Sequence, residues 1–464
     1  MAVRHGTPAP GAPLAGAAPP PRALRRTLGV RDLVLLAVGT VIGSGIFVVP
    51  ASVLRQTGGS TRVALLVWVV AGVLSLLGAL TYGELGAARP EAGGLYAYLR
   101  DAFGPLPAFL YGWTAFFVIA SGSVATLAVA FASYAQQFVA LTPWAAKAVA
   151  VLMIVVVTLV NVRGTRQGAD VQNVSTVAKA GAIVLVSVVL LALGRGGPVP
   201  NAPLPAAGGS PLAGVGLAMV GVLWAYEGWQ YVTFSAGETV DPQRTFPRGI
   251  AAGAALVIGI YVLANLGYVA ALGAGGVARS ERVAADAVGA VLGPAAAKAI
   301  AAVILVSMLS AANGITLTAP RMYYAMGRDG VFFARLGEVH PRFGTPAFAI
   351  VASALWAIAL AVTGTFEQLL TYVVFVGWIF YALGALAVFA YRRREPNAPR
   401  PFRTPGYPVT PFLFVLSAAG IVANTVVTQP VRAAVGIGIV LAGAPVFYVW
   451  RARRAAGRRP AAVS

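Results

Sequence analysis

The residues with the clearest chemical use are small residues inside an apolar segment. Residues 33–54 carry no charge, and a helix of that length spans the roughly 30 Å of a membrane's hydrocarbon core. Gly39, Gly43, Ser44 and Gly45 nevertheless stand in its middle. Unwound backbone is tolerated at membrane depth only where it lines a cavity or is buried in protein. The interruption therefore predicts a helix broken at mid-depth, where a small polar substrate binds.

A second interrupted segment carries a charge. Residues 211–239 are mostly apolar but contain Glu227 and Gly228 near their middle, next to Trp224 and Tyr226. A carboxylate inside a membrane costs about 2.5–3.5 kcal/mol, so it needs a partner or a role. Three interpretations of Glu227 stay open: attraction of a cationic side chain or amine of the substrate, proton binding, or a hydrogen bond to the unwound backbone.

Lys179 is a third candidate, because it lies in the apolar segment 171–193. Its ammonium could extend along the protein surface to the nearer membrane face, which is a structural interpretation. Removal from water disfavours the charged form of an amine, so a buried amine can lose and regain a proton. Lys179 would then be a proton relay.

Composition places these residues in an integral membrane protein. The 464 residues are 58% hydrophobic and 10% charged, with a mean hydropathy of +0.80, whereas soluble domains average about 25% charged residues. The net charge of +20 is not a sign of nucleic-acid binding, because the cations stand in short loops and tails between apolar runs. With no cysteine and two histidines, we expect no disulfide, no metal site and no cofactor.

Apolar runs separated by charged or Pro/Gly-rich segments predict an all-helical fold with twelve transmembrane helices in one domain, residues 28–452. Residues 1–27 are expected to be a disordered tail and residues 453–464 a basic tail. If both termini are cytoplasmic, 25 of the 34 Lys and Arg lie on that side and seven on the other, which predicts this orientation in an inner (plasma) membrane. The predicted spans are 31–56, 62–86, 105–137, 144–162, 171–193, 211–239, 248–273, 287–325, 346–363, 367–391, 409–428 and 432–451.

The two interrupted helices are the first and the sixth of this series. Interruptions five helices apart predict a five-plus-five inverted repeat, with units at about 31–193 and 211–391 and with helices 11 and 12 (409–451) outside it. Repeats of this kind bind their substrate between the two unwound segments.

Four motifs, in the expected order, resemble the amino acid–polyamine–organocation (APC) transporter superfamily, above all its L-type amino acid transporter branch and the bacterial relatives of that branch. The resemblance extends from about residue 27 to 452. The motifs are the first-helix sequence at 39–48, the sixth helix with its following loop at 223–251, the eighth helix and the loop behind it at 313–331 and 340–347, and the basic Pro-rich loop at 392–409.

An amino acid carries a carboxylate and an ammonium, and the two breaks suit both. Half-helix N-termini present free N–H groups to a carboxylate, and unwound carbonyls suit an ammonium. The resemblance implies the same division, although glycines at such places can also serve close helix packing. The predicted substrate-binding residues are Val41, Ile42, Gly43, Ser44 and Gly45 in the first break, Trp224, Ala225, Tyr226, Glu227 and Gly228 in the second, and Asn313 as a polar contact to the first helix.

The resemblance adds roles in coupling and gating for Lys179, Trp224 and Glu227. Sodium-independent members carry a lysine at the position of Lys179, with its ammonium where sodium-coupled relatives bind sodium near the first break. Trp224 has the position of an aromatic lid over the substrate, with packing as its alternative role.

The sequence thus predicts a sodium-independent secondary transporter of amino acids that works by alternating access, through exchange or proton symport. The alternatives are a polyamine or organic cation transporter of the same fold, or a membrane sensor that does not transport. The spans lack the cluster of acids and histidines that an enzyme would need. Without cysteine, the chain cannot form the disulfide by which animal L-type transporters join a heavy chain. The preferred amino acid and the oligomeric state do not follow from the sequence.

Overall fold

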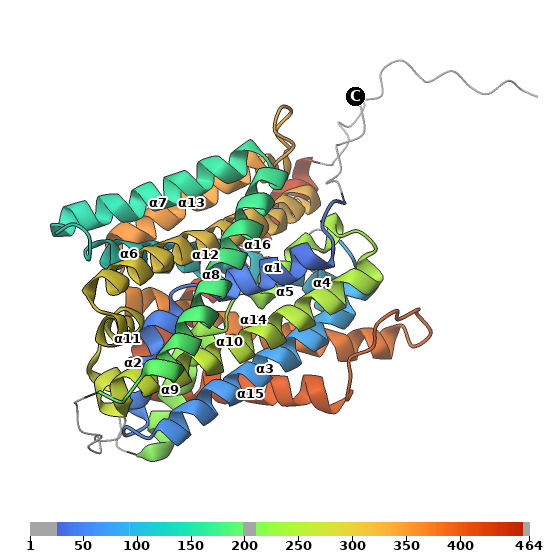
Figure 1. Cartoon of the computed structure of the whole chain (residues 1–464). Coiled ribbons are helices and arrows are strands. Elements are labelled where there is room, and N and C mark those ends of the chain that lie inside the picture. The colour runs from blue at the N-terminus through green and yellow to red at the C-terminus, as the bar shows by residue number, and fades with distance from the viewer. Residues whose placement is uncertain (1–25, 92, 198–209, 458–464) are drawn as a thin grey trace, which may run out of the picture.

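The computed structural model describes residues 26–91, 93–197 and 210–457. In these ranges the secondary structure is helical, apart from an isolated β-bridge between Leu28 and Thr239. Ten helices of the described ranges are long and apolar enough to cross a membrane. α1 (Val30–Val41) and α2 (Gly45–Gln56) meet at 47° and form an eleventh crossing if they are counted as one broken span. The chain is an all-helical, multi-pass membrane protein (Figure 1).

Each of the twelve predicted spans overlaps at least one helix, and α13, with 17 residues, is at the short end of the length that can cross a membrane. The first half contains α3 (Thr61–Ala88), α4 (Leu95–Phe103), α5 (Pro105–Thr114), the π-helix η1 (Ala115–Ile119), α6 (Ala120–Ala135), α7 (Pro143–Arg163) and α8 (Thr165–Leu193). The second contains α9 (Pro211–Ala225), the 3-10 helix η3 (Trp229–Glu238), α10 (Pro242–Arg279), α11 (Val283–Leu292), α12 (Pro294–Asp329), the 3-10 helix η4 (Ala334–Gly337), α13 (Ala347–Thr363), α14 (Phe366–Arg394), α15 (Val409–Thr428) and α16 (Pro430–Gly457).

Glycines account for two differences from the predicted boundaries. The predicted helix 287–325 is divided into α11 and α12, because Gly293 between them has a φ of 85°, which no helix accommodates. α4 was not predicted at all. It is a short helix with Arg100 in its last turn, set between two glycines of positive φ, and it therefore lacks the pattern of a membrane span.

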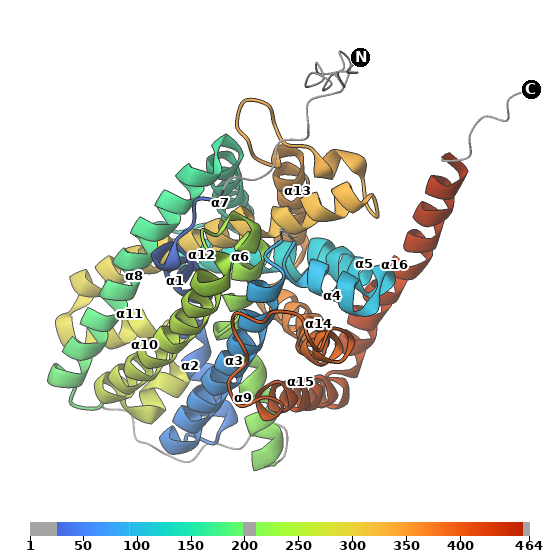
Figure 2. The ribbon, with the colours of Figure 1, turned by 90° about the vertical axis from the view of Figure 1, so that its right-hand side faces the viewer.

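Burial separates the helices into an inner and an outer group. Most of the apolar stretch of α12, α14 and the α5–η1–α6 helix is buried inside the protein, whereas most of that of α7, α8 and α16 is exposed. Figure 2 shows α16 along one side of the bundle, next to α5. The outer helices present apolar side chains to lipid, and the inner ones, together with α1, α2 and α9, position the polar groups described next.

The predicted tail 1–27 lies outside the described residues except for its last two. Thr27 and Leu28 donate their N–H groups to the Glu238 carbonyl, at 2.8 and 3.0 Å. In return, the Val240 N–H donates to the Leu28 carbonyl at 2.9 Å. The start of the first helix is therefore tied by backbone bonds to the end of η3. Residues 458–464 of the predicted basic tail also lie outside the described part.

Candidate functional site

The first break separates α1 from α2 at residues 42–44. Lys179 of α8 binds the free carbonyls at this break: its Nζ donates to the Gly39 and Ile42 carbonyls at 2.7 and 2.6 Å. It also donates to the Ser307 carbonyl of α12 at 3.3 Å. The side chain is fully buried, and no carboxylate lies within ion-pair distance of it in the described residues. A cation at the C-terminal end of α1 is also favourably placed relative to the helix dipole.

The opposite side of the same break presents N–H groups. α2 begins at Gly45 with Ser44 as its N-cap, and the Ser44 side chain makes no capping bond. Within the described chain, the N–H groups of Ser44 and Gly45 donate to no protein acceptor, and the buried Ser44 hydroxyl also has no partner. Free N–H groups at a helix start form a site for an anion such as a carboxylate.

The second break lies directly against the first. α9 ends at Ala225, and Gly228 has a φ of 140°, which requires glycine. A Cβ on Gly228 would lie 2.6 Å from the Thr40 carbonyl carbon, and a Cβ on Gly45 would lie 2.5 Å from the Ala225 Cα. The glycines of each break therefore permit backbone contact with the other.

Glu227 in the second break is buried within a network of neutral donors. Its Oε1 accepts from the Tyr381 hydroxyl at 2.9 Å and from the Gln230 amide at 3.3 Å. The Gln230 amide also reaches the Tyr381 oxygen at 2.9 Å, and its own oxygen accepts from the Gly228 N–H at 2.9 Å. The other carboxylate oxygen, Oε2, is buried with no partner in the described structure.

A cavity with about 290 Å³ of empty space lies between the breaks. Unpartnered polar groups from both sides reach it, which is typical of a site for a small polar ligand. Its lining residues are Thr40, Val41, Gly43, Ser44, Gly45, Ser123, Leu127, Trp224, Glu227, Tyr231 and Ile315.

Six of the predicted site residues line this cavity, namely Val41, Gly43, Ser44, Gly45, Trp224 and Glu227. Ile42, Ala225, Tyr226 and Gly228 form the breaks without lining it. Two of the carbonyls expected to hold an ammonium already have donors. The Val41 oxygen accepts the Gly43 N–H at 2.8 Å, and the Tyr261 hydroxyl lies 3.0 Å from the Val41 oxygen and 2.9 Å from the Ala225 oxygen. When Tyr261 donates its one hydrogen to the Ala225 oxygen, each of the two carbonyls keeps one lone pair for another donor.

Asn313 does not lie at this cavity. Its amide donates to the Gly168 carbonyl at 3.0 Å and to the Gln172 oxygen at 3.2 Å, and its own oxygen accepts from Asn161 at 2.8 Å. The expected contact with the first helix is made by its neighbour Gly314, where a Cβ would lie 2.4 Å from the Thr40 Cγ2. Asn313 thus joins α12 to α7 and α8.

The sequence prediction did not include five lining residues or Tyr381 behind Glu227. The five are Thr40 of α1, Ser123 and Leu127 of α6, Tyr231 of η3 and Ile315 of α12. Ser123, Leu127, Ile315 and Tyr381 lie on helices that look like ordinary apolar spans, so nothing in their local sequence marks them. Only packing against the breaks gives them a role.

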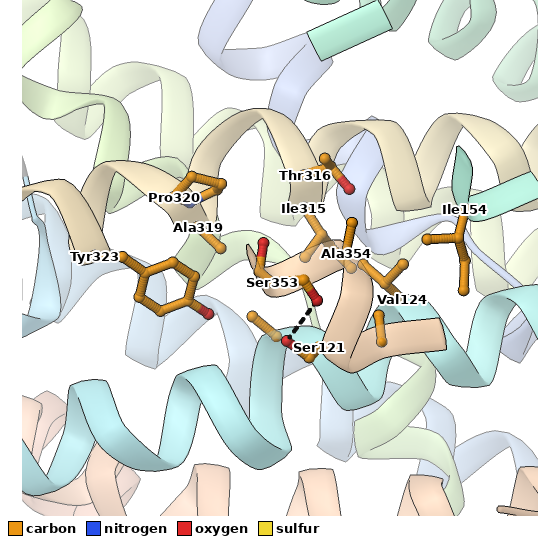
Figure 3. Close-up of a pocket in the computed structure, with 12 residues that line it drawn as sticks. Ser121, Val124, Ile154, Ile315, Thr316, Ala319, Pro320, Tyr323, Ser353 and Ala354 are labelled. Carbon is orange, nitrogen blue, oxygen red and sulfur yellow. Dashed lines mark hydrogen bonds between the residues drawn. The ribbon is translucent and has the colours of Figure 1, made fainter. Parts of the chain in front are cut away.

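A second cavity, also with about 290 Å³ of empty space, lies beside the first between α6, α7, α12 and α13 (Figure 3). Ile315 lines both cavities. In Figure 3 the Ser121 hydroxyl points to the Ser353 carbonyl, at 3.4 Å. The remaining lining is almost entirely apolar, and it includes Pro320 and Tyr323.

The ion pairs found in the described residues gather at one end of the bundle, which we call the basic face. It is formed by the loops and helix ends that carry Arg89, Arg100 and Arg392, and the sequence predicts it to be cytoplasmic. Arg100 lies 2.8 Å from Asp329, and Arg392 lies 2.8 Å from Glu84. Burial, reinforced by the charge of Asp329, raises the pKa of Tyr96, so its hydroxyl stays protonated and donates to that carboxylate at 2.7 Å.

Glu238 and Arg321 join η3 to α12 near the same face. Their side chains are both buried, and the carboxylate lies 3.5 Å from the guanidinium Nε. Glu238 is the last residue of η3, the 3-10 helix that follows the second break. Its carbonyl also accepts the N–H groups of Thr27 and Leu28, which precede α1. A single residue therefore connects both broken helices to α12.

Comparison with known proteins finds a permease family and relatives named as amino acid transporters and exchangers. A family model described as "Amino acid permease" matches residues 28–449. The serine/threonine exchanger SteT of Bacillus subtilis is 29% identical over 437 residues, covering 93% of this chain and 98% of that protein. The human b(0,+)-type amino acid transporter 1 is 33% identical over 417 residues, covering 89% and 85%. The human large neutral amino acids transporter small subunit 2 is 30% identical over 439 residues, covering 92% and 81%.

Proposed function

The chain belongs to the amino acid permease family of the APC superfamily, and from that membership we propose that it is a sodium-independent amino acid exchanger. It is a transporter and not an enzyme. Exchange is favoured over proton symport because the Bacillus relative that matches over 93% of the chain is itself named an exchanger. Under this proposal one amino acid binds between the breaks from one side of the membrane, and another returns from the opposite side.

The observation that carries the proposal is the pair of free N–H groups at the start of α2, beside a cavity that also contains Glu227. We assign the substrate carboxylate to the N–H groups of Ser44 and Gly45, with the Ser44 hydroxyl as a further donor. We assign the substrate ammonium to the second lone pairs of the Val41 and Ala225 carbonyls. Trp224, which is 7% exposed, covers the cavity as its lid.

Lys179 supports sodium independence. Its ammonium occupies the carbonyl oxygens of Gly39 and Ile42, at 2.7 and 2.6 Å, which are the kind of ligand that a sodium ion would need at this break. A fixed cation there satisfies the C-terminal end of α1 without an ion that must be carried across.

The wider architecture follows the same proposal. We infer twelve crossings, with α13 as the ninth, and a five-plus-five inverted repeat related through the two breaks. We also infer that the basic face is cytoplasmic, because most of the Lys and Arg of the chain lie in its loops and in both tails. The chain has no cysteine and so no disulfide-linked heavy chain.

A second candidate is transport of polyamines or other organic cations on the same fold. The unpartnered Glu227 Oε2 in the cavity favours it, because a carboxylate attracts a substrate amine. The two candidates differ in whether a substrate carboxylate is required, since only amino acids offer one to the α2 N-terminus.

The test is uptake into proteoliposomes that contain the purified protein. We expect labelled amino acid to accumulate only when unlabelled amino acid is inside, at the same rate in sodium and in choline buffers. Net uptake into empty liposomes driven by a pH gradient would replace exchange by proton symport. Stimulation by sodium would contradict sodium independence, and putrescine uptake without amino acid uptake would favour the second candidate.

A further inference from the structure

A large groove between η1, α13, α14 and α16 plays no part in the proposed transport mechanism. It holds about 1090 Å³ of empty space, against about 290 Å³ for the cavity between the breaks. We call it the aromatic groove, because four aromatic side chains form much of its wall: Trp113, Phe117, Trp356 and Tyr372.

Hydrogen bonds between helices fix two of these aromatic side chains. The Trp356 indole donates to the Phe117 carbonyl at 2.8 Å, and the Trp113 indole donates to the Ile439 carbonyl at 3.0 Å. Phe117 lies in the π-helix η1, where the wider turn shifts carbonyls out of the regular ladder and frees them for such contacts. The indole N–H groups are thereby satisfied, so the surface left facing the groove is apolar.

The groove spans about two thirds of the hydrocarbon thickness of one membrane leaflet and is polar at one end. Along α13 its lining runs from Trp356 to Thr363, which is roughly 10 Å at the helical rise. Thr363 and Gln368 stand at the end where α13 gives way to α14. The opposite, apolar end reaches Trp113, near the end of α5, and Ala442, in the middle of α16. Half of a hydrocarbon core is about 15 Å thick, so the groove extends from the interface toward the midplane.

A cation stands beyond the polar end. Arg432 precedes the groove residue Ile439 by seven positions on α16, so the two share a face about two turns apart. Its Nη1 donates to the Thr371 hydroxyl at 3.1 Å and to the Gln429 oxygen at 3.0 Å, and Thr371 adjoins the groove residue Tyr372. Among the described side chains no carboxylate lies within ion-pair distance of Arg432. Its remaining N–H groups suit a phosphate.

We propose that the aromatic groove binds one acyl chain of a membrane phospholipid whose phosphate contacts Arg432. The apolar walls match the acyl chain, the reach of about 10 Å matches the part of the chain next to the headgroup, and the cation at the polar end matches the phosphate. A bound lipid would fasten α13 to α16, which both line the groove. The site is independent of the proposed substrate, since none of its lining residues lines the cavity between the breaks.

The test is native mass spectrometry of the purified full-length protein with phosphatidylglycerol, and with a diacylglycerol of the same chains as the phosphate-free probe. Ala442→Trp fills the groove from an exposed position on α16, and Ala434→Trp is the matched control at an exposed position outside the lining. We expect the wild type and Ala434→Trp to retain one phosphatidylglycerol, and Ala442→Trp to lose it. Equal retention by the two tryptophan variants would overturn the proposal.

Arg432 is tested by the same measurement. We expect Arg432→Gln to weaken phosphatidylglycerol binding by about fivefold, as for one interfacial cation, while diacylglycerol binding stays unchanged and Arg432→Lys restores affinity. An unchanged phosphatidylglycerol affinity in Arg432→Gln would overturn the headgroup assignment. A wild-type dimer without lipid, converted to a monomer by Ala442→Trp, would show that the groove seats a second copy instead. Wild-type exchange activity in each variant confirms that it is folded.

Discussion

The two helix breaks are held by opposite charges, and the two charges are satisfied to different degrees. At the first break, Lys179 donates to three carbonyl oxygens within 3.3 Å. At the second, Glu227 receives two bonds on one oxygen, and its other oxygen has no partner in the described chain. The first charge is therefore fully used by the protein, whereas the second retains capacity for a ligand.

This difference gives the two breaks different roles. A fully satisfied buried charge stabilises one arrangement of the helices around it. A buried oxygen without a partner is costly, and a donor on the substrate relieves that cost. We therefore expect the first break to determine whether the site forms, and the second to determine which substrates it accepts.

The largest predicted effect is that of Lys179→Ala. It leaves the Gly39 carbonyl without its buried donor and leaves the Ile42 carbonyl with only the Ser307 hydroxyl, at 3.1 Å. A hydrogen bond to a charged group contributes about 1.5–3 kcal/mol. We expect exchange in proteoliposomes to fall by about 100-fold for every substrate, as the loss of such bonds implies, and the melting temperature in detergent to fall as well.

The control for this variant is Lys298→Ala, since Lys298 is an exposed lysine of α12. We expect this control to transport like the wild type. If Lys179→Ala also transports normally, the ammonium does not hold the first break, and the division between the breaks is wrong.

Gly45→Ala is expected to have the next largest effect, because it tests the contact between the breaks. The added Cβ would lie 2.5 Å from the Ala225 Cα, a distance that forces backbone to move. Overpacking of this kind costs about 1–3 kcal/mol, and we expect exchange to fall for all substrates alike. Gly259→Ala is the matched control, because no atom lies within 4 Å of its added Cβ. Equal exchange rates in the two variants would mean that the breaks need not touch.

The sequence predicted the breaks well, because they depend on local composition. Gly45 and Gly228 are informative because each stands in the middle of an apolar span next to other small or polar residues, and a buried Lys179 or Glu227 is costly enough to need a role. The sequence did not predict Tyr261, Tyr381 or Ile315, whose roles arise only where separate helices meet. It also placed Asn313 at the first helix, whereas the described contacts of Asn313 join α12 to α7 and α8.

Glu227→Gln probes the second break with a smaller and selective effect. Glutamine keeps an oxygen that can accept from Tyr381 but removes the charge. If the carboxylate attracts a cationic group of the substrate, we expect uptake of arginine to fall by about tenfold, the lower range for a charge-assisted bond, while uptake of serine changes little. Competition by unlabelled amino acids in the counterflow assay measures both.

Glu281→Gln is the control, because Glu281 is an exposed acid outside the cavity. A loss of pH dependence without a change in substrate preference would identify proton binding as the role of Glu227. No change in either would leave the hydrogen bond with Tyr381 as its role, and both breaks would then be structural.

Ile315→Ala tests which residues near the second break determine the accepted substrates, and it is expected to have the smallest effect on total activity. Ile315 lines both the cavity between the breaks and the cavity of Figure 3, so its side chain is part of the partition between them. Its removal joins two spaces of about 290 Å³ each. We expect larger side chains, such as that of phenylalanine, to compete better in counterflow against labelled serine.

Truncation of a buried isoleucine also destabilises a protein by about 2–5 kcal/mol, so a matched variant is needed to separate the two effects. Ile304→Ala provides it, because Ile304 is fully buried on the same helix and lines neither cavity. Both variants are expected to lower the melting temperature, but only Ile315→Ala should change the ratio of phenylalanine to serine competition. The same ratio in both would mean that the substrate side chain does not reach Ile315, and that selectivity is determined nearer to Glu227.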